Sequence, residues 1–176
     1  MDVFSHGLWT WLAAKFANLK LNVRLNTRLT LLFGVLPDIF SFAPLFIWLF
    51  FNLISNSLGL ANFPDLINME PAAHDTLFIF KATSLLYSIT HSLVVFIIIF
   101  MAILLARHKP FLPLLGWLFH IIIDIPTHSY KFYPTPFLWP LSSWKFDGIS
   151  WGNKCFMLAN YSLIIIAYLL IRRIKK

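Results

Sequence analysis

Residues 119–142 read FHIIIDIPTHSYKFYPTPFLWPLS, and the interpretation of the whole chain depends on this stretch. His120 and Asp124 are one helical turn apart in an apolar run, so on a helix their side chains share one face, about 5–6 Å apart at Cβ. Pro126 disturbs the helix just afterwards, because its ring clashes with the carbonyl four residues earlier, and His128 follows the break. Buried ionisable groups without partners are costly. A metal ion is one partner that would satisfy both the imidazole and the carboxylate.

The composition is that of an integral membrane protein. Hydrophobic residues make up 59% of the 176 residues and charged residues only 12%, against about 25% charged in a typical soluble domain. The mean hydropathy is +0.76. The single cysteine, Cys155, excludes an internal disulfide and a cysteine-based zinc cluster. We expect an all-α membrane-embedded bundle that forms one domain over residues 1–176.

The apolar runs predict four transmembrane spans preceded by a short N-terminal helix over residues 4–20. The expected spans are 29–54, 83–106, 111–125 and 155–171. Basic residues gather at 15–28, 107–109 and 172–176, whereas the loop between the first two spans is acidic. The positive-inside rule therefore predicts cytoplasmic termini, with loop 126–154 on the other side. Because the net charge of +7 comes from these span ends, we expect no nucleic-acid partner.

Three ionisable residues from different spans are expected at similar depth. Pro37 and Pro44 interrupt the first span and predict a broken or kinked helix with Asp38 near the break, and broken membrane helices often border ligand sites. At 1.5 Å per residue, Asp38, His91 and His120 each lie about 12–15 Å from one end of their spans. In a hydrocarbon core about 30 Å thick, that places all three near mid-bilayer.

The candidate metal ligands supply only nitrogen and oxygen. They are His6, Asp38, His91, His120, Asp124 and His128. This donor set suits a divalent metal, with Zn²⁺ favoured and Mn²⁺ or Fe²⁺ as alternatives. Asp38 and His91 are also the candidates for a catalytic general base.

Structural roles compete with the metal for each residue. His120 and Asp124 can form a hydrogen-bonded pair that locks the bundle, Asp38 can cap a broken helix, and His91 can be a core histidine. His6 can lie at the membrane interface, and His128 can lie outside the membrane.

A family resemblance adds to this interpretation. Its motifs are Leu36-Pro37-Asp38, Thr90-His91-Ser92, His120 with Asp124 and Thr127, the segment 136–140 (PFLWP), and the early His6. In this order they resemble the membrane-bound, metal-dependent hydrolases (YdjM-like inner-membrane hydrolases). More loosely, the His-x-x-x-Asp pair is similar to that of zinc phospholipase C and related nucleases. The resemblance implies an inner (plasma) membrane location and hydrolytic activity.

The chain departs from the family pattern at two places. Phe40 and Ser41 stand where the family often has a second Asp and a His. Leu86, Tyr87 and Ser88 stand where it often has His-Arg-Gly. These departures remove possible ligands and a phosphate-binding arginine.

Three functions are compatible with the sequence. The leading hypothesis is hydrolysis of a membrane lipid, or another amphipathic ester or phosphoester, by a metal-activated water. The alternative is a small cation or proton transporter, or an ion-binding membrane protein, that uses the same His/Asp cluster. The third is a catalytically inactive relative that keeps a structural metal.

Overall fold

The computed structural model describes residues 1–21, 23–55, 78–131 and 133–174, and within these ranges all the regular elements are helices, with no β-strand. The elements are α1 (Val3–Lys20), α2 (Thr27–Ile54), α3 (Phe78–Thr90), α4 (Leu93–Arg107), the 3₁₀ turn η2 (Leu112–Leu114), α5 (Leu115–Thr127) and α6 (Lys154–Ile174). The all-α prediction is confirmed. Most of the predicted acidic loop lies outside the described residues.

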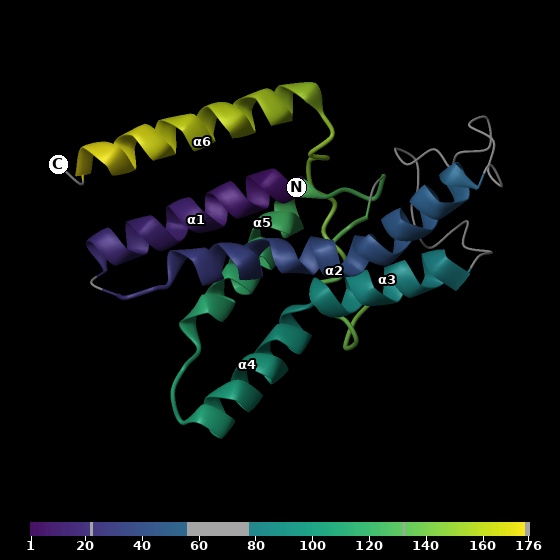
Figure 1. Cartoon of the computed structure of the whole chain (residues 1–176), viewed down its shortest axis with the longest axis horizontal. Helices are drawn as coiled ribbons and strands as arrows, with labels where there is room; N and C mark the ends of the chain where they lie inside the picture. Colours follow the sequence, from purple (N-terminus) through teal and green to yellow (C-terminus); the bar gives the residue numbers. More distant parts are fainter. Residues whose placement is uncertain (22, 56–77, 132, 175–176) are drawn as a thin grey trace.

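Helix α2 is the centre of the bundle and packs against α1, α3 and α5 (Figure 1). It runs as one continuous helix through Pro37 and Pro44, so the chain is not broken at Pro37. Pro37 lacks the amide that would donate to the Phe33 carbonyl, one turn earlier. The carbonyl of Pro37 itself accepts from Ser41 Oγ at 2.7 Å.

A break lies instead between α3 and α4, where the direction of the chain bends by 60°. His91 and Ser92 occupy the bend, in the middle of the span predicted over residues 83–106. Ser92 caps α4 by accepting a hydrogen bond from the Val95 amide at 3.2 Å. The Leu93 amide donates to the carbonyl of Phe137 at 2.9 Å. A distant loop thus satisfies backbone groups that the bend releases.

Two glycines allow α1, α2 and α5 to approach closely. A Cβ added at Gly34 would lie 2.3 Å from Thr10 Oγ1 of α1, and one at Gly116 would lie 2.0 Å from the Thr30 carbonyl oxygen of α2. Small residues of this kind are how membrane helices pack without clashes. The close approach brings the polar faces of the three helices together.

Helix α6 runs parallel to α1 and is joined to it by polar contacts. Trp9 Nε1 donates to Asn160 Oδ1 at 2.8 Å, and Tyr161 donates to Asp2 at 2.9 Å. Asp2 is the N-cap of α1. Burial acts to raise the pKa of the Asp2 carboxyl, but hydrogen bonds from Ser5 and Tyr161 outweigh it, so this pKa lies below its usual value. These hydrogen bonds to Asp2 hold the start of α1 against α6.

By length and composition, α2 (28 residues) and α6 (21 residues) can cross a membrane, and the bent pair α3 and α4 can form a third crossing. The span predicted over residues 111–125 corresponds to η2 and the 13-residue α5. That helix is shorter than the roughly 20 residues that a crossing needs. The structure thus supports two to three crossings.

We predict that Gly116→Ala lowers the stability of the protein, because the added methyl would push α5 away from the α2 backbone. Overpacking of this kind costs about 1–3 kcal/mol. Thermal unfolding in detergent measures the effect. The matched control is Gly152→Ala, whose added Cβ would meet Ser150 Oγ at an ordinary 3.6 Å. Equal melting temperatures for the two variants would contradict the close α2–α5 contact.

Candidate metal centre

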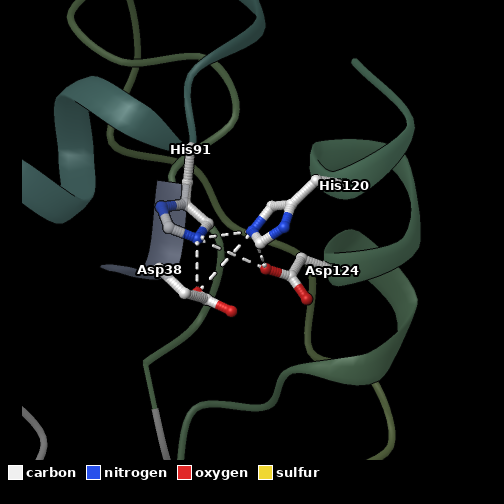
Figure 2. A group of neighbouring side chains, drawn as sticks. All are labelled: Asp38, His91, His120 and Asp124. Atoms are coloured by element: carbon white, nitrogen blue, oxygen red, sulfur yellow. Dashed lines mark hydrogen bonds and ion pairs between the residues drawn. The ribbon is translucent and has the colours of Figure 1, made fainter. Parts of the chain in front are cut away.

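The structure brings all six candidate ligands into one cluster. They are His6 from α1, Asp38 from α2, His91 from the α3–α4 bend, His120 and Asp124 from α5, and His128 directly after α5. Asp38 is 7% exposed and His128 5% exposed, and the other four are fully buried. Figure 2 shows Asp38, His91, His120 and Asp124 pointing toward a common centre.

The distances among these four side chains fit the ligands of one metal ion. Asp38 Oδ1 lies 3.3 Å from His91 Nε2 and 3.7 Å from His120 Nε2. Asp124 Oδ2 lies 3.4 Å from His91 Nε2 and 3.2 Å from His120 Nε2. Two atoms bound tetrahedrally to Zn²⁺ at about 2.0–2.1 Å are about 3.3 Å apart. One ligand atom from each residue lies within 4.8 Å of all the others, so the cluster can hold a metal ion.

The hydrogen bonds of two histidines orient their rings so that a cation could bind between them. His120 Nδ1 lies 2.7 Å from the Gly34 carbonyl oxygen, and His91 Nδ1 lies 3.1 Å from that of Tyr87. A carbonyl only accepts, so each Nδ1 is the donor and carries the proton. The two Nε2 atoms, only 3.0 Å apart, then face each other with their lone pairs. A metal ion between them would turn this repulsion into coordination, and a backbone carbonyl on the other ring nitrogen is typical of metal-bound histidines.

His128 is oriented in the same way. Its Nδ1 lies 2.7 Å from the Tyr133 carbonyl oxygen, so Nε2 is the acceptor. That Nε2 atom lies 3.2 Å from Asp124 Oδ1. The Met1 α-amino group is placed between them, at 2.6 Å from Asp124 Oδ1 and 2.8 Å from His128 Nε2. Here too, two acceptors are held together by a positive charge.

Several buried polar atoms of the cluster lack a hydrogen-bond partner among the described residues. These are both ring nitrogens of His6, Asp38 Oδ2 and Asp124 Oδ2. His6 Nε2 still lies 2.9 Å from Asp124 Oδ1 as an ion-pair contact, and its ring stacks on His120 at 3.8 Å. Unpaired buried polar atoms are rare, and an ion is one of the few explanations for several in one place. The residues therefore fit a divalent metal.

The loop after α5 holds His128 in position. The Gly148 amide donates to the His128 carbonyl at 2.8 Å, and the Ile149 amide donates to the Pro126 carbonyl at 2.9 Å. A Cβ at Gly148 would lie 2.3 Å from the Pro126 carbonyl oxygen. The loop thus packs directly onto the residues that end α5, and His128 is buried within the protein.

The sequence analysis missed three contributors to the site. The Tyr87 ring stacks on His91 at 3.8 Å, and its hydroxyl donates to the Tyr133 carbonyl at 3.0 Å. The Met1 amino group and the Gly34 carbonyl also contact the cluster. Tyr87 precedes His91 by four residues, so helical spacing could have indicated it. The backbone groups carry no sequence signal.

Comparison of the chain with family models, with curated proteins and with solved structures finds no match. The case for the site therefore depends on its geometry.

We predict that the protein purified without an affinity-tag histidine tract contains a bound divalent metal, and that His120→Ala or Asp124→Ala abolishes its binding. Elemental analysis measures the content. Both variants should also melt at lower temperature, because a ligand that binds only the folded state stabilises it. His108→Asn, a change at an exposed histidine outside the cluster, is the control. Metal content equal to wild type in both cluster variants would refute the assignment.

Proposed function

We propose that the protein is a membrane-embedded, metal-dependent hydrolase that acts on a lipid-like ester or phosphoester. The observation that supports this most directly is an apolar groove next to the metal-binding cluster. Its volume is about 190 Å³, and it is lined by Phe33, Leu36, Pro37, Phe40, Thr90 and Trp117. Two of these residues directly precede candidate ligands, Pro37 before Asp38 and Thr90 before His91.

The groove suits a hydrocarbon chain rather than a polar substrate. Five of its six side chains are apolar or aromatic, and Phe40 is 58% exposed on the surface of a helix long enough to cross a membrane. The Trp117 indole donates to the Thr90 carbonyl, and the Thr90 hydroxyl lies 2.9 Å from His91 Nδ1. A chain lying there would bring an attached headgroup close to Asp38 and His91.

The proposed chemistry combines a metal ion held by the cluster with a proton acceptor supplied by Asp38. A divalent ion held by the cluster supplies Lewis acidity, which lowers the pKa of water to about 7 and polarises a carbonyl or phosphoryl oxygen. Asp38 is the most exposed of the four converging ligands, at 7%. Its Oδ2 atom has no hydrogen-bond partner among the described residues. Asp38 would hold the ion through one carboxylate oxygen, and its other oxygen would accept a proton from a water that adds to the ester and then return that proton to the departing alcohol.

The family resemblance of the sequence motifs agrees with this proposal. In particular, the paired His120 and Asp124 are the motif residues that the resemblance assigns to metal binding. The replacements at Phe40 and Ser41 leave Asp38 as the acidic side chain that α2 contributes to the cluster. They therefore increase the dependence of any activity on Asp38.

The proposal is tested by Asp38→Asn in a hydrolysis assay with phospholipid in mixed micelles. We expect turnover to fall by roughly 10²–10⁴-fold, the range for loss of a general base, and metal content to fall as well if Oδ1 is a ligand. Asp147→Asn, at an exposed carboxylate outside the cluster, is the control. An Asp38→Asn protein with full metal content and wild-type turnover would exclude Asp38, and wild-type protein inactive on every ester and phosphoester would exclude the function.

We further propose that the basic end of the bundle faces the cytoplasm of a cell whose inner (plasma) membrane holds the protein. Lys15, Thr27 and Arg172 line one pocket, so the basic ends of α1 and α6 lie together near the start of α2. The positive-inside rule assigns this end to the cytoplasm. Met1 lies in the cluster, at the opposite end of α1 from Lys20.

Cysteine labelling in intact cells tests this orientation. Cys155 is replaced by serine, and single cysteines are introduced at the exposed Leu141 and Arg173. We expect a membrane-impermeant maleimide to label the cysteine at 141 and to label the one at 173 only after the cells are opened. Labelling of both positions in intact cells would contradict the proposed orientation.

A further inference from the structure

We propose that the cluster binds two divalent cations bridged by Asp124, with the second ion held by His6, His128 and Asp124 Oδ1. This inference rests on the proposed function, because it concerns the same site. It starts from Asp124, whose two carboxylate oxygens contact different pairs of histidines. Oδ2 lies 3.4 Å from His91 Nε2 and 3.2 Å from His120 Nε2. Oδ1 lies 2.9 Å from His6 Nε2 and 3.2 Å from His128 Nε2.

The two carboxylate oxygens of Asp38 also face different histidines. Its Oδ1 lies 3.3 Å from His91 Nε2, whereas its Oδ2 lies 3.9 Å from His6 Nε2. Each carboxylate therefore presents one oxygen to the His91 and His120 side and the other to the His6 side. Carboxylates arranged in this way are suited to bridging two ions about 3.5–4 Å apart, as in two-metal hydrolytic sites.

The second position has the properties that a cation site requires. The Nε2 atom of His128 is an acceptor that faces Asp124, because the Nδ1 atom of the same ring donates to the Tyr133 carbonyl. Both nitrogens of His6 are fully buried and lack a hydrogen-bond partner among the described residues. A cationic group, the Met1 α-amino group, already lies between Asp124 Oδ1 and His128 Nε2. A divalent ion would take its place between the same acceptor atoms.

The net charge of the site makes the second ion bind more weakly than the first, and it also narrows the class of substrate. Asp38 and Asp124 together carry two negative charges, which one divalent ion neutralises. A second divalent ion leaves an excess of two positive charges in a buried site, and this is costly without a counter-ion. A phosphate group supplies that counter-ion and a neutral ester does not. The pair therefore favours a phosphoester as substrate.

The test is a titration of the chelator-treated, full-length protein with Mn²⁺, with and without inorganic phosphate, followed by binding stoichiometry and electron paramagnetic resonance. We expect two ions per chain at saturation and the multiline spectrum of a spin-coupled pair. Inorganic phosphate should tighten the binding of the weaker ion. Binding of only one ion, or of a second ion that shows no coupling, would overturn the proposal.

Variants assign the second ion to its ligands. His128→Gln and His6→Gln should each bind one ion and lose the coupled spectrum, while the ion at His91 and His120 stays. His108→Asn is the control and should keep both ions. Retention of the coupled pair in both glutamine variants would also overturn the proposal.

Failure of the two-ion proposal and failure of the hydrolase assignment give different results. Two coupled ions in a protein without hydrolytic activity would retain the inference and reject the function. One ion in an active protein would do the reverse.

Discussion

The structure depends on a set of hydrogen bonds from imidazole Nδ1 atoms to backbone carbonyls. His91, His120 and His128 each place Nδ1 against a main-chain oxygen, at 3.1, 2.7 and 2.7 Å. Each bond fixes the ring orientation and leaves the Nε2 lone pair facing the interior. Lone pairs and carboxylates gathered in a buried space repel one another unless a positive charge is present. The packing therefore favours a cation among these side chains.

Close helix packing provides these carbonyls. Gly34 is the clearest case, because it allows Thr10 to lie against α2 and its carbonyl also accepts from His120. A side chain at Gly34 would separate α1 from α2, and His6 would move away from Asp124 with it. One small residue thus couples the helix spacing to the geometry of the centre.

The bend between α3 and α4 has a similar double role. It places His91 at a helix end, where the ring turns toward Asp38 and Asp124, and it releases backbone groups that the loop around Phe137 satisfies. In a low-dielectric interior such a bend is stable only where protein groups replace the lost hydrogen bonds. The same loop region continues to Gly148, which packs on the end of α5 and fixes His128. The loop therefore supports the cluster from two sides.

The sequence by itself determined the helical class, the membrane-like composition and the six residues that meet in the cluster. This succeeded because helical periodicity fixes which residues share a face, and because ionisable residues in apolar helices need partners, whatever the packing. The tertiary structure decided which helix breaks, and it placed the bend at His91 rather than at Pro37. At the break, the Phe137 carbonyl accepts a hydrogen bond from the Leu93 amide, a contact between segments far apart in the sequence. It also decided which imidazole nitrogens face inward, because their carbonyl partners at Gly34 and Tyr133 come from other parts of the chain.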